Sequence, residues 1–317
     1  STQDTRDAIV ELRNQGIEGI ILDLRNNGGG SLVDAVDITG LFIDEGPVVQ
    51  VKNSQGMKRV LQDDDDTLVY DGPLVVLVNR FSASASEIVA AALQDYRRAI
   101  VVGGQHTHGK GTVQTIIDLN ENIPLLHLRR YDDLGALKAT IQKFYRVDGG
   151  STQYKGVEPD VVLPSLFENL KSGEQYLDYS LPWDQDEAVK YDAYSDKITD
   201  LQSIIDRSKA RIKESTDLLL IKEEAARAGK RSEQTVIELD LDSMRAKREE
   251  EKQAREKVGV HYGRLEEDEL EEAAVPDEIP QSPESDPEED WIADLAGDPY
   301  VTESEMIIND LVQLLRK

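Results

Sequence analysis

Up to Pro164 the chain alternates short apolar runs with amphipathic stretches, and this alternation is the feature that most constrains its fold. The apolar runs GIEGIILDL (16–24) and GPLVVLVN (72–79) have the length of strands, and each leads toward a stretch whose apolar residues recur at helical spacing. A change from strand-length runs to a 3.6-residue period predicts strand–helix units. Such units pack as an α/β domain around a sheet.

The strand at 72–79 is the clearest, because it is short, rich in β-branched residues and bounded by polar ones. We expect helices around residues 8–17, 32–42 and 87–96. Further strands are expected at 16–24, 99–102 and 112–119 and at the start of 137–153. The segment VEPDVVLP (157–164) closes this first domain.

From Ser165 onward the character of the sequence changes, and we expect a mostly helical domain over 165–263. Helices are expected around residues 198–205 and 218–221, a short strand at 235–241 and a solvated, highly charged helix at 242–257. An acidic, proline-containing linker is expected at 264–300, where low hydrophobicity and high charge disfavour a packed structure.

The last segment, 301–317, is expected to be an amphipathic helix. Thr302 and Glu305 have the spacing of a capping box, which predicts where this helix begins. Its apolar residues form a face broad enough to dock onto another surface.

Composition excludes several classes of function. The 317 residues contain no cysteine, so disulfides, thiolate metal sites and cysteine nucleophiles are ruled out. The formal net charge of −27 repels nucleic-acid phosphates and anionic lipid surfaces, so we expect no nucleic-acid partner. No apolar run approaches the roughly 20 residues that a membrane helix needs, so no integral membrane segment is expected.

The glycine-rich stretch RNNGGG (25–30) lies between an expected strand and an expected helix. Consecutive glycines there can turn backbone N–H groups toward one point and form an anion nest. The simpler interpretation is a tight loop that needs positive φ. Two donors aimed at one oxygen would equally suit an oxyanion hole, and the residues alone leave these three interpretations open.

The stretch FSASASE (81–87) places serines at every second position before a helix. Ser84 and Glu87 have capping-box spacing, and judged alone this favours a helix cap. The position at the end of a strand and at the positive end of the next helix favours a nucleophile, because a developing anion is stabilised there. Both roles can coexist on neighbouring serines.

A serine nucleophile needs a base, and the chain has four histidines. His261 lies in the charged region, which indicates a surface position. His127 lies between leucines, which indicates a partly buried position in a strand. His106 and His108 form an H-x-H pair, but the sequence nearby supplies no carboxylate to complete a zinc site. Lys110, between two glycines, is the remaining base candidate, since a desolvated lysine can lose its charge.

Four segments together resemble the carboxyl-terminal processing peptidases, a serine–lysine family with a ClpP/crotonase-like α/β core. They are LDLRNNGGG, VNRFSASASEI, QDYRRAIVVGGQHTHGKGTVQ and KGVEPDVVLP. The resemblance is closest to the tail-specific branch of that family. It continues through TIQKFYRVDGGSTQYKGV, LPWD and GDPYVTESEMIINDL, and so covers nearly the whole chain.

Carried over position by position, the resemblance implies that Ser84 is the nucleophile and Lys110 the general base. Gln114 matches the residue that helps to hold the lysine. Asp95 matches an aspartate implicated in the active site of the tail-specific enzymes.

The oxyanion donors implied by the resemblance are the backbone N–H groups of Ala85 and of either Gly29 or Gly30. In the implied mechanism, neutral Lys110 takes the Ser84 proton during attack on a peptide carbonyl and later protonates the leaving amine. The implied reaction needs no metal and no cofactor.

The resemblance also implies a bacterial periplasmic location, protein substrates with unstructured, apolar C-terminal tails, and a lipoprotein adaptor as partner. The family's PDZ domain, N-terminal helical domain and first core strand are not matched, so we expect a fragment. Two alternatives remain: an inactive fragment that serves as an interaction module, and a crotonase-like acyl-thioester enzyme, which would bind coenzyme A.

Overall fold

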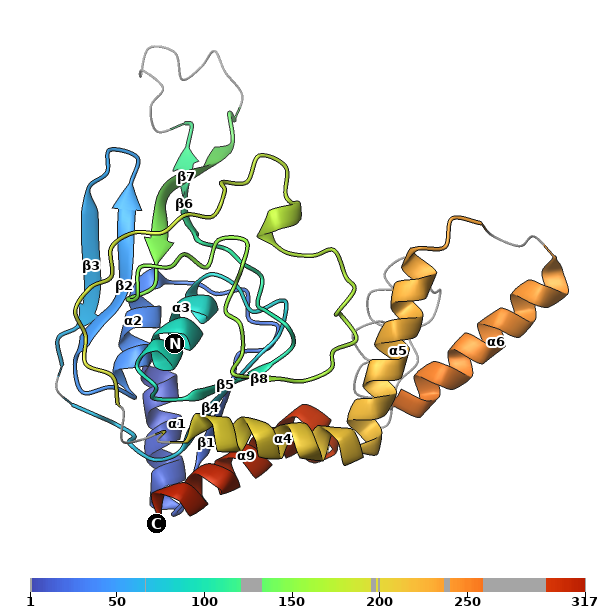
Figure 1. Ribbon diagram of the computed structural model, residues 1–317. Helices are drawn as coiled ribbons and strands as arrows, with labels where there is room; N and C mark the ends of the chain where they lie inside the picture. Colours follow the sequence, from blue (N-terminus) through green and yellow to red (C-terminus); the bar gives the residue numbers. More distant parts are fainter. Residues whose placement is uncertain are drawn as a thin grey trace.

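The computed structural model of the chain describes residues 2–65, 67–120, 133–194, 198, 200–236, 240–258 and 295–316. Two four-stranded sheets organise its first half, with strand orders β1-β4-β5-β8 and β3-β2-β7-β6 (Figure 1). The strands are β1 Ile20–Asp23, β2 Gly46–Asn53, β3 Lys58–Asp63, β4 Leu74–Val78, β5 Ile100–Gly103, β6 Thr112–Asp118, β7 Ala136–Tyr145 and β8 Val161–Val162.

The first sheet is parallel. β1 pairs with β4 from Ile20↔Leu74 onward, and β4 pairs with β5 from Val75↔Ile100 onward. Every residue of β4 is buried, and alternate side chains enter two different hydrophobic clusters on the two faces of the sheet. Burial on both faces explains why the strand reads as an uninterrupted β-branched run.

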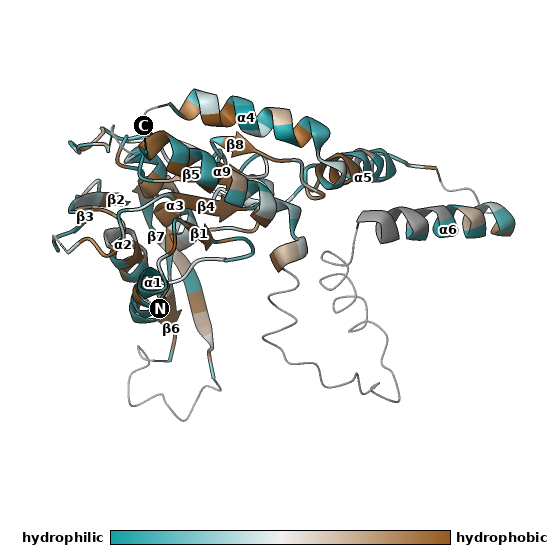
Figure 2. Ribbon diagram, turned by 90° about the horizontal axis from the view of Figure 1, so that it is seen from below, coloured by the Kyte–Doolittle hydropathy of each residue, from teal (hydrophilic) through white to brown (hydrophobic). Residues whose placement is uncertain are grey.

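Helices cover both faces of the parallel sheet. On one face α1 Thr2–Asn14, α2 Leu32–Gly40 and α3 Ala85–Asp95 enclose a core that also includes the antiparallel sheet. On the other face α4 Leu201–Glu214, α5 Thr216–Ser232 and α9 Pro299–Leu315 build a second core against β4 and β5. Figure 2 shows the apolar strands enclosed between these helices. The expected α/β core with a helical C-terminal part is therefore confirmed.

The expected helices and strands of the first domain are present, with ends shifted by a few residues. The β2–β3 hairpin was not predicted. Its second strand, KRVLQD, is mostly polar and only partly buried, so it carries no clear apolar alternation. The charged helix is present as α6 Leu241–Val258, which extends away from the sheets (Figure 1).

The capping box predicted at Thr302 is wrong. Helix α9 begins at Pro299, and Asp298 caps it by accepting hydrogen bonds from the backbone N–H groups of Tyr300 (2.8 Å) and Val301 (3.3 Å). Aspartate followed by proline is a strong start signal, because proline at the first helical position loses no hydrogen bond. Thr302 lies inside the first turn and donates to the Asp298 carbonyl.

Some predictions fall outside the described residues. These are most of the linker at 264–300, residues 237–239 of the short strand predicted at 235–241, and the two histidines His127 and His261. Leu241, the last residue of that predicted strand, begins α6. Among the described residues, no helix combines the length and hydropathy needed to cross a membrane.

Candidate active site

The three serines of FSASASE have different environments. Ser82 is buried and its hydroxyl donates to the Leu24 carbonyl at 2.7 Å. Ser86 is buried and its hydroxyl donates to Asn27 Oδ1 at 2.9 Å. Ser84 lies between them and is only half-buried. Two of the three serines therefore hold the loop structure together, and the middle one is accessible to a substrate.

Ser84 occupies a strained turn between β4 and α3. Its backbone has φ 59° and ψ −115°, a region that residues with a Cβ rarely adopt. Such a conformation costs about 1–3 kcal/mol and persists only where the surroundings impose it. A sharp strand-to-helix turn is the device that exposes a nucleophilic serine at the edge of a parallel sheet. Here it places Ser84 at the N-terminus of α3.

Glu87 connects the Ser84 turn to the segment that carries Lys110. Its carboxylate is fully buried, and Oε2 accepts from the backbone N–H of Ser84 at 2.7 Å and of Lys110 at 3.0 Å. Oε1 accepts from the hydroxyl of Thr107 at 2.6 Å and the backbone N–H of Gly109 at 2.7 Å. The Ser84 and Lys110 backbones are thereby held within two hydrogen-bond lengths of each other.

Burial raises the pKa of Glu87 from its ordinary value of 4.5 to about 7. The four donated hydrogen bonds act in the opposite direction, because each favours the charged carboxylate. The residue is thus a titratable group at the junction of the two segments that carry the proposed nucleophile and base.

The Lys110 loop is also held from its other side, by the segment that follows β7. The Lys110 carbonyl accepts from the Thr152 hydroxyl at 2.9 Å. The backbone N–H of Gly111 donates to Gln153 Oε1 at 2.7 Å, and Gln153 Nε2 donates onward to the Leu181 carbonyl. Gly109 has φ 87°, and a side chain there would meet the Tyr154 backbone. The loop backbone is therefore fixed on both sides of the lysine.

The glycine turn lies against the Ser84 turn. Gly29 has φ 90°, and a Cβ at this position would lie 2.5 Å from the Ala83 carbonyl oxygen and 2.7 Å from the Ala85 backbone nitrogen. Only glycine allows so close an approach. The Gly29 N–H donates to Asn27 Oδ1 at 2.9 Å, whereas a Cβ at Gly30 would meet open space.

The structure does not bring Asp95 to this site. Asp95 is the last residue of α3, at the end opposite Ser84, and an 11-residue helix separates its ends by about 16 Å. Its carboxylate pairs with Arg146, with Oδ1–Nη2 at 2.5 Å and Oδ2–Nε at 3.1 Å. Gln114 lies on β6, four residues after Lys110. Its side chain is exposed, and it lies at a bulge in the pairing of β6 with β7.

The H-x-H pair shows no metal-like arrangement. His106 Nδ1 lies 2.6 Å from the Thr107 carbonyl oxygen, and His108 Nε2 lies 3.8 Å from Glu174 Oε2. Within the described part of the chain, no group of three or more His, Cys, Asp or Glu residues could hold a metal ion.

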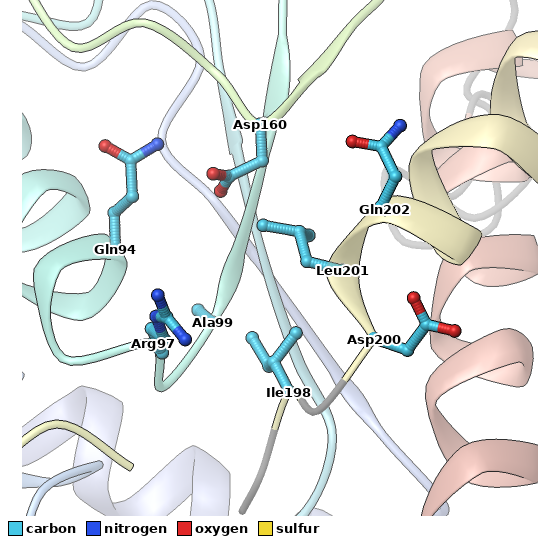
Figure 3. A pocket seen from close by; sticks show the side chains of 8 residues that line it. All are labelled: Gln94, Arg97, Ala99, Asp160, Ile198, Asp200, Leu201 and Gln202. Atoms are coloured by element: carbon cyan, nitrogen blue, oxygen red, sulfur yellow. The ribbon is translucent and has the colours of Figure 1, made fainter. Parts of the chain in front are cut away.

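A cavity of about 260 Å³ lies away from this chemistry, between the end of α3 and the start of α4 (Figure 3). Gln94 and Arg97 line it on one side, Asp160 lies next to β8, and Gln202 lines it from α4. Because it opens at the end of α3 opposite Ser84, it is separate from the candidate active site.

Sequence reasoning missed several residues that build the site. The sequence indicated Glu87 only as a helix-capping residue. No local sequence pattern predicted its hydrogen bonds to the Lys110 loop. Asn27 and Gln153 act through contacts across 59 and 42 residues of sequence, respectively. Side-chain to backbone bonds of this kind leave no periodic pattern in a sequence.

Comparison with known proteins places these segments in a family. Residues 1–163 match the family described as peptidase family S41, and residues 167–313 match the C-terminal domain of tail specific protease. The tail-specific protease of Haemophilus influenzae is 41% identical over 255 residues, covering 79% of this chain and 36% of that protein. The chloroplastic C-terminal processing peptidase of Tetradesmus obliquus is 36% identical, covering 54% of this chain and 35% of that protein.

Among solved structures, the photosystem II D1 C-terminal processing protease is 36% identical with a TM-score of 0.44, covering 51% of this chain and 39% of that one. The chain spans little more than a third of the length of these relatives. The S41 match extends over just over half of the chain and includes the parallel sheet, the Ser84 turn and the Lys110 loop. The chain therefore belongs to peptidase family S41.

Proposed function

We propose that the protein is a serine endopeptidase in which Ser84 is the nucleophile and Lys110 the general base. The observation that carries this proposal is the shared carboxylate of Glu87, which accepts from the backbone N–H groups of both residues. Ser84 also has the strained backbone and the position at a helix N-terminus that suit a nucleophile. Membership of a peptidase family favours peptide hydrolysis over acyl-thioester chemistry.

In the proposed mechanism, Ser84 Oγ attacks the carbonyl carbon of a peptide bond while neutral Lys110 accepts the hydroxyl proton. Lys110 then gives this proton to the leaving amine, and water hydrolyses the acyl-enzyme. No metal or cofactor is required by these steps.

The oxyanion of the tetrahedral intermediate would accept from the backbone N–H groups of Ala85 and Gly30. Gly30 is the preferred glycine donor because the Gly29 N–H is already donated to Asn27, while Gly30 borders open space. Each such donor contributes on the order of 3 kcal/mol to transition-state stabilisation in comparable enzymes.

The two remaining candidates take supporting roles in this proposal. Gln114, four residues beyond Lys110 on β6, is proposed to help hold the lysine. Asp95 is proposed to act on the fold through its pair with Arg146 rather than at the reacting atoms.

The proposed substrates are proteins with unstructured, apolar C-terminal tails, cleaved in the bacterial periplasm with a lipoprotein adaptor as partner. The support is the 41% identity to a bacterial tail-specific protease and the match of residues 167–313 to the family described as the C-terminal domain of tail specific protease. Fractionation of cells that express the intact protein tests the location, and recovery with the cytoplasm would contradict it.

The catalytic proposal is tested by cleavage of an unstructured protein that carries an apolar tail. Ser84→Ala and Lys110→Ala in the intact protein are each expected to lower kcat by roughly 10⁴-fold or more, as in other nucleophile–base enzymes. Ser54→Ala and Lys138→Ala are matched controls, because both side chains are exposed and outside the site, and they are expected to leave kcat unchanged.

Normal cleavage by either Ser84→Ala or Lys110→Ala would refute the mechanism. The proposal also requires a rate that rises with pH, since the neutral form of Lys110 is the base. Inhibition by a zinc chelator would instead favour the H-x-H interpretation.

A further inference from the structure

Arg25, the first residue of the glycine-rich loop, is joined to the C-terminal helix. Its Nη1 donates to Asp298 Oδ2 at 2.6 Å, across 273 residues of sequence. Asp298 is the N-cap of α9, and its other oxygen accepts from the first backbone N–H groups of that helix. One carboxylate therefore both starts α9 and holds the glycine-rich loop.

The rest of the guanidinium is also engaged. Nε and Nη2 donate to Asp23 at the end of β1, at 3.0 Å and 2.7 Å to Oδ2. The guanidinium carbon lies 5.7 Å from the centre of the Tyr300 ring, and the Tyr300 hydroxyl donates to the Pro164 carbonyl. The Arg25 and Asp298 side chains are only 18% and 15% exposed, so this pair is little screened by water.

From Arg25 the chain enters the candidate oxyanion turn within two residues. The Asn27 carbonyl accepts from the Ala83 N–H at 3.0 Å, and Asn27 Oδ1 accepts from Gly29 and Ser86. The placement of Arg25 thus sets the start of a loop whose next bonds are made to the nucleophile turn.

We propose that Arg25 and Asp298 are positioning residues for catalysis, through which helix α9 holds the glycine turn in the geometry that binds the oxyanion. The inference rests on the proposed oxyanion role of the glycine turn. It adds that the C-terminal segment is part of the catalytic framework, although it lies outside the 1–163 match to the peptidase family.

The docking of α9 does not depend on this pair alone. Further along the helix, Arg211 on α4 pairs with Glu303 at 2.7 Å and with Asp310 at 2.8 Å, and Arg207 also pairs with Asp310. The helix also buries Ile307 and Leu311 in the second core. Loss of the Arg25–Asp298 pair is therefore expected to release the loop without detaching the helix.

The test uses Asp298→Asn in the intact protein, because asparagine is as good an N-cap as aspartate but has no charge for Arg25. On a short chromogenic peptide we expect kcat to fall roughly tenfold with KM changed less than twofold, since the oxyanion forms only in the transition state. A peptide aldehyde, whose adduct with Ser84 places an oxygen in the same site, should bind correspondingly more weakly.

Glu303→Gln is the matched control, as it removes a charge on α9 from a pair that does not touch the loop. It should leave kcat within twofold of the native value. Arg25→Met should lower kcat as Asp298→Asn does, and the double variant should be no slower than either single variant, because the two residues act as one unit.

Equal kcat for Asp298→Asn and Glu303→Gln would overturn the inference. It would also be overturned if the fold-losses in kcat of Asp298→Asn and Arg25→Met multiply in the double variant. Melting temperatures identify a variant that merely unfolds. If Asp298→Asn unfolds, the kcat of Arg25→Met relative to that of Glu303→Gln tests the inference instead. Failure of the catalytic proposal itself has a different signature, namely cleavage that persists in Ser84→Ala.

Discussion

At the scale of single residues, Glu87 joins the two segments on which the proposed chemistry depends. Its carboxylate accepts four hydrogen bonds, from Ser84, Thr107, Gly109 and Lys110, in a fully buried position. An unpaired charge there would be prohibitive, and four donors are what make the charged form tolerable. The carboxylate thereby fixes the backbones of the proposed nucleophile and the proposed base relative to each other.

The titration of Glu87 predicts a pH-dependent stability. Because its pKa is raised from 4.5 to about 7 on folding, the native state binds a proton more tightly than the unfolded chain. Its stabilising contribution is therefore complete below the unfolded pKa and is lost as pH rises through about 7. The total change is about 3 kcal/mol.

The measurement is urea unfolding of the native protein and of Glu87→Gln, which has no titrating group at this position, over a series of pH values. The free energy of unfolding of the native protein minus that of the variant should decline between pH 4.5 and 7 and then become constant. A difference that is constant across this range would show that folding does not shift the pKa of Glu87, and one that increases with pH would show that folding lowers it.

The choice among the three serines of FSASASE could not be made from local sequence patterns. The composition and spacing of FSASASE left a helix cap and a nucleophile both open, and only a family resemblance selected Ser84. The structure separates the serines by burial and hydrogen bonding, since Ser82 and Ser86 are committed to Leu24 and Asn27. These contacts depend on the tertiary fold, so no local pattern could reveal them.

At the scale of elements, the two ends of α3 carry residues of different kinds. Its N-terminus presents Ser84, whereas its C-terminus carries Asp95 in a buried ion pair with Arg146. Burial raises the pKa of Asp95, and the hydrogen bonds and charge of Arg146 oppose that effect. A buried carboxylate in such a pair serves the packing of the helix end.

We therefore predict that Asp95→Asn lowers stability and leaves the chemistry intact. Removing one charge of a buried pair leaves the Arg146 guanidinium without its hydrogen-bonded carboxylate, which costs up to about 3–5 kcal/mol. The melting temperature should fall, while the acylation rate per folded molecule stays within about twofold of the native rate. A well-folded variant that acylates a hundredfold more slowly would place Asp95 in the catalytic machinery after all.

The elements that were predictable are those with a strong periodic signal. The strands of the parallel sheet and helices α1–α3 follow from apolar runs and helical spacing, because both patterns reflect burial against this core. Strand β3 lacks such a pattern, since none of its residues is fully buried. At α9, two start signals overlap in DPYVTESE, and the earlier one caps the helix.

At the scale of the whole molecule, the parallel sheet supports two cores, and the C-terminal helices complete the second. Helix α9 buries Ile307 and Leu311 in the core that includes Val75 and Leu77 of β4. The sequence could show that this helix had an apolar face. It could not show the surface that the face covers, because the partner strands lie more than 200 residues away.

This arrangement explains why the two family matches describe physically continuous parts of one structure. The S41 segment supplies the sheet and the candidate catalytic residues, and the following segment covers its second face. Through Arg25 and Asp298 it also contacts the loop beside Ser84.

The most direct test of the central claim is to map where a fluorophosphonate probe attaches, because such probes react with a serine whose hydroxyl is activated by a base and an oxyanion site. Mass spectrometry of the labelled intact protein should find the adduct on Ser84, with labelling at least a hundredfold slower in Lys110→Ala. An adduct on Ser82 or Ser86, or labelling of Ser84 at an undiminished rate without Lys110, would contradict the account.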